Sequence, residues 1–291
     1  MSDQYSLRNI HLKRDYLSHS DLMTHLEAAE GIQYRHANVL FSGGKWQGKR
    51  WDPLRNVKPS PSALVIGHSD TIITDTTVKE IRSIHPKSLV IASNLSDGAA
   101  SEPYCYDLPL GIPNVDRSTW IHRVQSSRSV LQLGWALGHL LASRHFRGAY
   151  ANFSARNNPS ERSPVLKIVD SQNHLHRGRF LVSRAGRLQD LLWLSYWGLN
   201  ICPEGNGPDT HRVYETLLMG AFPIILKSHH VFRLLSSLRL PFVGLDNWNQ
   251  LGDYDFLREN FDALRSQDWD YRPLSRSYWI DRIHRLAEDE C

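Results

Sequence analysis

The stretch Asn200-Ile-Cys-Pro-Glu-Gly-Asn-Gly-Pro-Asp-Thr-His-Arg-Val-Tyr-Glu-Thr-Leu-Leu-Met-Gly-Ala-Phe-Pro-Ile-Ile-Leu226 carries the strongest structural signal in the chain. It contains an apolar start, a Gly-Asn-Gly-Pro turn, a helix-periodic run over 210–219 and a second apolar run. Asp209 or Thr210 suits a helix N-cap, and Gly220 suits a C-terminal stop. The stretch therefore predicts a strand, a Gly-rich loop, a helix and a second strand.

Three polar side chains crowd the start of the predicted helix. His211 and Glu215 lie one turn apart on one face, with Arg212 beside them. Backbone N–H groups, the positive end of the helix dipole and two basic side chains suit a phosphate or diphosphate, and Glu215 could accept hydrogen bonds from a ribose diol. The alternative is that Glu215 pairs with Arg212 at i, i+3 while His211 caps the helix.

The run from Cys202 to Pro223 resembles the C-terminal half of exostosin-like glycosyltransferases, which have the two-domain GT-B fold. The resemblance implies that this segment binds the nucleoside diphosphate of an activated sugar. Many GT-B transferases carry paired glutamates separated by seven residues, and here Gly207 occupies the earlier position. The positions that match the family's motif, and that we expect to bind the donor, are Gly205, Asn206, Gly207, Asp209, Thr210, His211, Arg212 and Glu215.

Length and charge limit the class of protein. A chain of 291 residues can form two domains of about 140 residues, each with its own core. The formal net charge is +4, the pI is near 9.0, and the arginines are scattered. This mild excess favours an anionic small ligand, with at most peripheral membrane association, and no nucleic-acid partner.

Cysteine usage and the N-terminus bear on location. Cys105, Cys202 and Cys291 are odd in number and lack CxxC or CxxH spacing, so they indicate neither a disulfide framework nor a zinc site. The segment Met1–Arg14 has no apolar signal region, and no stretch approaches the length of a membrane span. We expect a cytoplasmic protein.

A βαβ unit is predicted in the N-terminal half. Residues 63–67 and 88–92 are apolar strands that flank a helix over 76–84, which is typical of a parallel sheet. Functional loops follow the carboxyl ends of such strands. His68, Asp70 and Asp97 lie in these loops and are candidates for the general base that an acceptor hydroxyl requires. Alternatively, the aspartates cap turns and the histidine packs in the core.

The next segments suggest a domain boundary and further anion contacts. A mostly apolar helix over 124–143 is expected to close the first domain as a buried packing helix, and residues 103–113 to form a loop. A strand over 148–153 would then open the second domain. Ser154, Arg156 and Arg162 follow this strand and could contact a phosphate or the acceptor, or could be solvated. Arg184, expected at the end of a strand over 180–183, is a candidate second phosphate contact.

The chain contains two Asp-x-Asp triplets, Asp253-Tyr254-Asp255 and Asp268-Trp269-Asp270. A metal-dependent transferase would place such a triplet at the end of an apolar strand. Both triplets instead lie in aromatic, helix-rich sequence, which favours helix caps and surface charge. We therefore expect no metal or other cofactor, and expect arginine, histidine and helix N-terminal amides to stabilise the leaving diphosphate.

Together these features predict an α/β, GT-B-like fold of two Rossmann-like domains. Residues 1–145 would form a reduced acceptor domain, and residues 146–291 a nucleotide-sugar-binding domain whose final helix, over 275–288, returns to the first domain. The predicted function is metal-independent transfer of a sugar from a nucleoside-diphosphate-sugar donor to a hydroxyl of a glycan or other acceptor. The alternatives are a non-catalytic nucleotide- or glycan-binding protein and another nucleotide-sugar-using enzyme.

Overall fold

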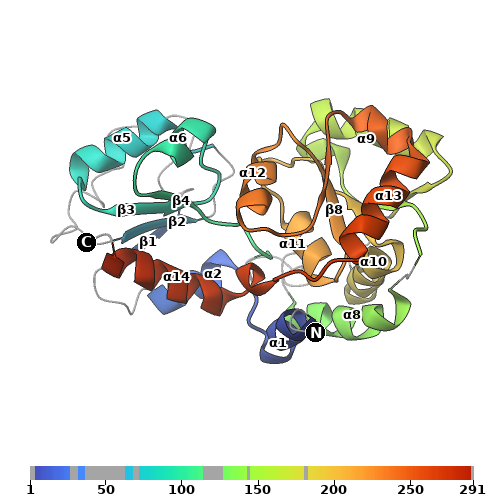
Figure 1. Cartoon of the computed structure of the whole chain (residues 1–291), viewed down its shortest axis with the longest axis horizontal. Helices are drawn as coiled ribbons and strands as arrows, with labels where there is room; N and C mark the ends of the chain where they lie inside the picture. The colour runs from blue at the N-terminus through green and yellow to red at the C-terminus, as the bar shows by residue number, and fades with distance from the viewer. Residues whose placement is uncertain are drawn as a thin grey trace. The chain divides into compact units, whose positions relative to one another are not determined.

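The computed structural model describes residues 4–26, 32–36, 63–67, 72–113, 127–142, 145–179 and 183–289 (Figure 1). The protein is an α/β structure with two sheets in which every described strand pair is parallel. The chain divides into two compact units. Unit 1 comprises residues 1–16, 111–206 and 210–275, and unit 2 comprises residues 17–110, 207–209 and 276–291.

The sheet of unit 2 has the order β1-β2-β3-β4. Strands β2 (Ala63–Gly67) and β3 (Leu89–Ala92) flank helix α5 (Asp75–Ile84), which confirms the predicted parallel βαβ unit. The described side chains of β2 and β3 are all buried, as expected for a sheet covered on both faces. The prediction of a loop over 103–113 was wrong in part, because β4 (Cys105–Asp107) pairs with β3, and β1 (Ile32–His36) pairs with β2.

Helices cover this sheet within unit 2. The Thr74 side chain caps α5, whose buried residues Val78 and Ile81 join the core formed with β2 and β3. Helix α6 (Asp97–Ser101) follows β3, and α14 (Arg276–Asp289) packs against α2 (His19–Leu26). The last helix of the chain therefore clusters with the first sheet rather than with the second.

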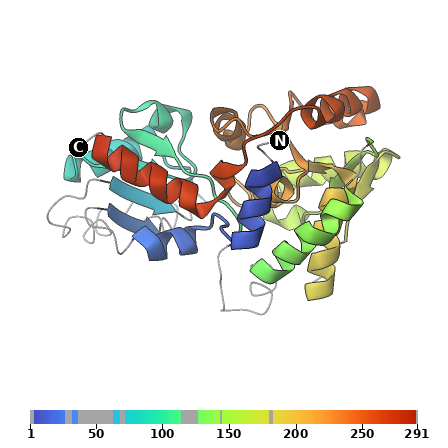
Figure 2. The ribbon, with the colours of Figure 1, turned by 60° about the horizontal axis from the view of Figure 1, so that its bottom comes forward.

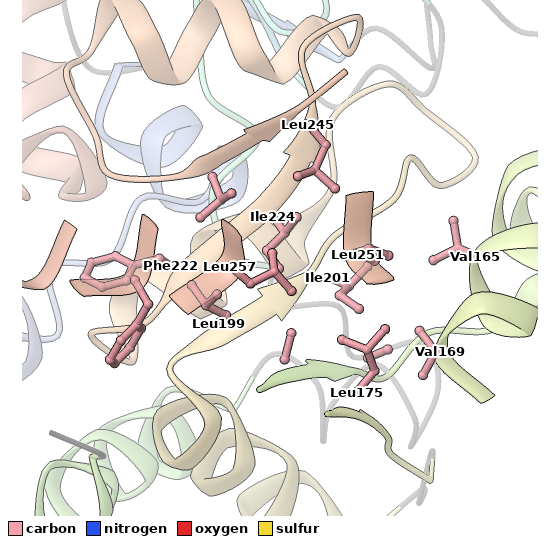
Figure 3. Close-up of a cluster of buried hydrophobic side chains, with 14 residues drawn as sticks. Val165, Val169, Leu175, Leu199, Ile201, Phe222, Ile224, Leu245, Leu251 and Leu257 are labelled. Carbon is pink, nitrogen blue, oxygen red and sulfur yellow. The ribbon is translucent and has the colours of Figure 1, made fainter. Parts of the chain in front are cut away.

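The sheet of unit 1 has five strands in the order β6-β5-β7-β8-β9. Their bounds are β5 Ala149–Ala151, β6 Leu175–Arg177, β7 Leu199–Ile201, β8 Phe222–Leu226 and β9 Val243–Leu245. The strand–loop–helix–strand unit expected from the motif is present as β7, α11 and β8. Figure 3 shows the core beside this sheet, a single buried cluster that contains the strand residues Leu199 and Ile224 together with Val165 and Val169 of α9 and Leu257 of α13.

The described helices of unit 1 are α1 (Gln4–Lys13), α8 (Arg128–Leu141), α9 (Pro159–Ser171), α10 (Arg184–Trp197), α11 (His211–Leu218), α12 (His230–Ser237) and α13 (Tyr254–Arg265), with short 3-10 helices η2 (Ala155–Asn157), η3 (Trp248–Gly252) and η4 (Arg272–Leu274). No helix among the described residues is both long enough and apolar enough to cross a bilayer.

Helix α8 departs from its expected place. It was expected to close the first domain, but it packs against α10 and belongs to unit 1, so the division does not follow residue 145. Gly134 and Gly138 permit this close packing, because a Cβ on Gly134 would lie 2.9 Å from the Leu191 Cβ and a Cβ on Gly138 would meet the Ser195 Oγ. The expectation of a buried helix was also wrong in part, because the opposite face of α8 is exposed.

Candidate functional site

The five-stranded sheet reverses its winding between β5 and β7. Strand β5 has β6 on one side and β7 on the other, and β8 and β9 continue outward from β7. In open parallel sheets, ligands bind outside the carboxyl ends of the strands at such a switch point. The loops that follow these two strands are 152–154 and 202–210, and the second is the Gly-rich loop of the motif. The switch point therefore brings the motif to the position where the fold favours a ligand.

Helix α11 begins directly after the Gly-rich loop. Thr210 is its N-cap, with φ −132° and ψ 140°, and the Thr210 side chain makes no capping hydrogen bond. The first turn contains no acidic residue. Gly220 follows the helix with φ 72°, the left-handed conformation expected at this position. The first turn of α11 thus contributes no carboxylate of its own, and the helix dipole favours an anion at this end.

Four charged side chains from α10 and α11 form a buried cluster, which we call the ion cluster: Arg187, Asp190, Arg212 and Glu215. Arg187 donates hydrogen bonds to both oxygens of Glu215, through Nη2 to Oε1 and through Nη1 to Oε2 at 3.3 Å. Its Nη1 also lies 3.3 Å from Asp190 Oδ2. Arg212 Nη1 lies 2.8 Å from the same oxygen and 3.7 Å from Glu215 Oε2. The two positive and two negative charges balance.

Strand β5 anchors the ion cluster through Asp190. The Tyr150 hydroxyl and the Asn152 amide donate to Asp190 Oδ1 at 3.0 Å and 2.7 Å. Burial alone would raise the pKa of Asp190, but Arg212, Arg187 and the Asn152 hydrogen bond outweigh it and hold that pKa below its usual value. Burial opposes the charge of Arg212, yet Asp190 and Glu215 raise the Arg212 pKa. Asp190 and Arg212 therefore form a charged pair.

The members of the ion cluster differ in exposure. The side chain of Arg212 is 17% exposed, while those of Arg187, Asp190 and Glu215 are 10%, 9% and 5% exposed. Arg212 is thus the member with most surface available to a ligand. The alternative pairing of Arg212 with Glu215 is present only as the longer 3.7 Å contact, since each residue has a nearer partner on α10.

Arg162 ties the two switch-point loops together. Its guanidinium donates to the carbonyl of Ser154 in the first loop at 3.1 Å, and to those of Pro203 and Glu204 in the second at 3.3 Å and 2.6 Å. A Cβ on Gly205 would lie 3.0 Å from Arg162 Nη2, so a glycine suits this position. Arg162 is only 7% exposed, and this burial lowers the pKa of its guanidinium. Its main role here is to hold the loops, rather than the ligand contact expected for it.

A second polar cluster lies beside the Gly-rich loop. One ligand-type atom each from Glu161, Glu204 and His229 lies within 4.8 Å of the others, as a cation site would require. However, Glu161 already accepts from His229 Nε2 at 2.8 Å and from Trp248 Nε1 at 3.1 Å, and its other oxygen accepts from Asn158. Burial raises the pKa of Glu204, which weakens it as an anionic ligand. Both oxygens of Glu161 thus already accept hydrogen bonds from neighbouring side chains.

Two motif residues, His211 and Asp209, form hydrogen bonds with backbone groups of the protein. His211 Nδ1 donates to the Gly111 carbonyl at 2.7 Å within unit 1. Asp209 belongs to unit 2, is 5% exposed, and accepts from the Leu110 N–H at 3.0 Å. Gly207 also clusters with unit 2, while Asn206, an exposed residue, belongs to unit 1. Asp209 therefore fixes the chain rather than capping α11.

The remaining predicted contacts near the sheet of unit 1 are exposed. Ser154 and Arg156 follow β5, and the Ser154 Oγ accepts from the Arg156 N–H at 3.2 Å. Arg184 is the first residue of α10, which Ser183 caps, so it opens a helix; the expected strand over 180–183 lies mostly outside the described residues. The arginine that enters the ion cluster is instead Arg187, one turn further along.

The candidate bases lie in unit 2 or outside the described residues. Asp97 is the exposed first residue of α6, and Ser96, not Asp97, caps that helix. His68 and Asp70 are among the residues outside the described ranges. In the Asp-x-Asp triplets, Asp253 caps α13 and Asp270 pairs with Arg272 at 2.6 Å, in agreement with their interpretation as caps and surface charge.

Sequence reasoning missed Arg187 and Asp190. Their i, i+3 spacing on an expected helix was visible, but such a pair is usually a solvated surface contact. Only the packing of α10 against α11 and β5 reveals that these side chains are buried partners of Arg212 and Glu215.

The sequence matches no protein-family model, and a comparison with curated proteins finds no significant relative.

Proposed function

We propose that the protein is a metal-independent glycosyltransferase that uses a nucleoside-diphosphate-sugar donor and has a GT-B-like pair of Rossmann-like domains. The observation that carries this proposal is the position of the Gly-rich loop and the N-terminus of α11 at the switch point of the five-stranded sheet. The resemblance of residues 202–223 to exostosin-like transferases supports the choice of ligand.

The donor's diphosphate lies against the first turn of α11 in this proposal. The helix dipole and Arg212 supply positive charge there, and Asp190 holds the Arg212 guanidinium at 2.8 Å. Glu215 is 4% exposed and both of its oxygens contact Arg187. We therefore assign Glu215 to positioning the two arginines, and no longer to binding the ribose diol.

Sugar transfer then requires charge stabilisation and proton removal. The acceptor oxygen forms a bond to the anomeric carbon as the bond from that carbon to the diphosphate oxygen breaks, and the nucleoside diphosphate leaves with the electron pair. Arg212 gains importance as negative charge grows on the leaving oxygen. A base takes the proton of the acceptor hydroxyl, and His68, Asp70 and Asp97 remain the proposed candidates.

A ligand screen tests the proposal. Nucleoside diphosphates and their sugars are added to the protein in the presence of EDTA, and the melting temperature and the release of free nucleoside diphosphate are measured. A ligand at a hundred times its dissociation constant should stabilise the fold by about 2.7 kcal/mol. Arg212→Lys should reduce this shift, whereas Arg258→Ala, which removes an exposed arginine of α13, should not.

The result separates the candidate functions. Binding together with acceptor-dependent release of nucleoside diphosphate supports transfer. Binding without any turnover would indicate the non-catalytic nucleotide-binding protein, and release that needs no acceptor would indicate a hydrolase. Failure of every nucleotide to shift the melting temperature would remove the donor site from α11.

A further inference from the structure

The four side chains of the ion cluster form two pairs that differ in their access to a ligand. Both oxygens of Glu215, a side chain only 5% exposed, accept from Arg187. Arg212 Nη1 lies 2.8 Å from Asp190 Oδ2 and 3.7 Å from Glu215 Oε2. Burial opposes the charge of Arg212, and Asp190 raises the Arg212 pKa more than Glu215 does. Asp190 is therefore the main counter-charge of the arginine with most surface available to a ligand.

Other contacts fix Asp190 independently of Arg212. Its helix, α10, packs against α8, β5 and α11, and Figure 2 shows α8 and α10 side by side. Asp190 Oδ1 accepts hydrogen bonds from Tyr150 and Asn152. The Asp190 side chain is 9% exposed, so water and salt screen its charge much less than a surface charge. A ligand that contacts Arg212 therefore also experiences the negative charge of Asp190.

The charge on the ligand changes during the proposed reaction. A nucleoside-diphosphate sugar has one negative charge on each of its two phosphates. Loss of the sugar frees the terminal phosphate, which ionises a second time near about pH 6, so the product carries about three negative charges above that pH. Coulomb energy is proportional to charge. The repulsion from Asp190 is therefore greater for the diphosphate product than for the donor.

We propose that Asp190 is a positioning residue that offsets the charge of Arg212 and thereby speeds the departure of the nucleoside diphosphate. This inference rests on the proposed function, because it assigns a role within the same site. Arg212 still stabilises the leaving oxygen as the bond to the anomeric carbon breaks. Without the carboxylate, the site would hold the more highly charged product more tightly, and product release would limit turnover.

Replacement of the carboxylate by an amide tests the proposal. Asp190→Asn removes one negative charge and keeps a side chain of nearly the same shape. Wild type and variant are titrated at about pH 8 with uridine, UDP-glucose and UDP, and with guanosine, GDP-mannose and GDP. We expect the variant to bind the donor more tightly, the diphosphate more tightly still, and the nucleoside as before. If the donor gains about tenfold in affinity, proportionality to charge predicts about thirtyfold for the diphosphate.

Three further variants separate charge from structure, and each is judged by the ratio of diphosphate affinity to donor affinity. Asp190→Ser is a second uncharged replacement and should raise this ratio as Asp190→Asn does. Tyr150→Phe removes a hydrogen bond to Asp190 without a change of charge, so it should lower the melting temperature and leave the ratio unchanged. Asp255→Asn removes a charge from a side chain of α13 that is 71% exposed, and should also leave the ratio unchanged.

Two kinds of failure can be told apart. If neither set of nucleotides binds the wild-type protein, the proposed function is overturned and this inference falls with it. If the wild type binds donor and diphosphate but the two uncharged replacements of Asp190 leave the affinity ratio unchanged, the proposed function stands and this inference is overturned. An equal shift of the ratio in Tyr150→Phe would also overturn it, because Asp190 would then act through structure alone.

Discussion

Arg212 Nη1 lies 2.8 Å from Oδ2 of Asp190, a residue of the preceding helix, and 3.7 Å from Glu215 on its own helix. Asp190 in turn is held by Tyr150 of β5 and by Asn152, which directly follows that strand. The guanidinium that faces the proposed diphosphate is therefore fixed by contacts across two other elements, and its orientation does not depend on α11 alone.

Loss of Glu215 should destabilise the protein. Glu215→Ala leaves Arg187 buried without its main partner, and breaking a buried ion pair in this way typically costs about 3–5 kcal/mol in the free energy of unfolding. Urea denaturation measures this change. Arg177→Ala, which removes an exposed pair with Asp170, is the control and should cost less than about 1 kcal/mol. Similar losses in the two variants would argue against a buried cluster.

Arg212 should matter more for turnover than for donor binding. If it stabilises the charge of the leaving diphosphate, Arg212→Lys keeps the positive charge but loses the fixed orientation, and kcat should fall by about tenfold or more with a smaller change in donor affinity. Steady-state kinetics and direct titration of the donor separate the two effects. An equal loss in both would assign Arg212 to ground-state binding.

Stability should fall in acid through His11. Burial lowers the pKa of His11 to about 4, while its hydrogen bond with the Leu218 carbonyl partly opposes this. The unfolded chain has a histidine pKa near 6.5 and binds the proton first, so the free energy of unfolding should decrease by roughly 3 kcal/mol as the pH falls from about 6.5 to about 4. Denaturant titrations at several pH values measure this slope.

The variant His11→Gln isolates that contribution, because an amide does not titrate. Its stability should change less over the same pH interval than that of the wild type. The control His139→Gln changes an exposed histidine of α8 and should keep the wild-type slope. An unchanged slope in His11→Gln would mean that other groups cause the acid sensitivity.

The close contact of α8 with α10 should tolerate no added methyl group. Gly138→Ala gains helix propensity of about 1 kcal/mol, but its Cβ would meet the Ser195 Oγ, which donates to the Met219 carbonyl, and we expect a net loss of about 1–3 kcal/mol. In Gly98→Ala on α6 the nearest atom is 3.6 Å away, so this control should be neutral or stabilising. Thermal unfolding of both variants checks the difference.

Chelation should leave the proposed reaction intact. The charge at the switch point comes from Arg212 and the N-terminus of α11, and the oxygens of Glu161 are already hydrogen bonded. Turnover measured before and after EDTA treatment should therefore agree. Loss of turnover that a divalent ion restores would direct attention to Glu161, Glu204 and His229 as ligands.

Local patterns in the sequence determined several elements by themselves. The apolar runs of β2, β3 and β8, the end of α11 at Gly220 and the cap at Asp253 could be predicted because they depend on periodicity and turn chemistry within a few residues. The Gly-rich loop between β7 and α11 could be located for the same reason. A candidate site near Arg212 was thus available from the sequence.

Only the tertiary structure decided which side chains meet. Arg187 and Glu215 are 28 residues apart, and Tyr150 and Asp190 are 40 apart, so neither contact leaves a local pattern. Strand β4, with three residues, was too short to show a period. Helix α8 was mostly apolar in sequence, yet packing buries Leu131, Gly134 and Gly138 and leaves Leu133, Leu137, Leu140 and Leu141 exposed. Burial depends on which neighbours the whole fold supplies, and that information is not contained in any single segment.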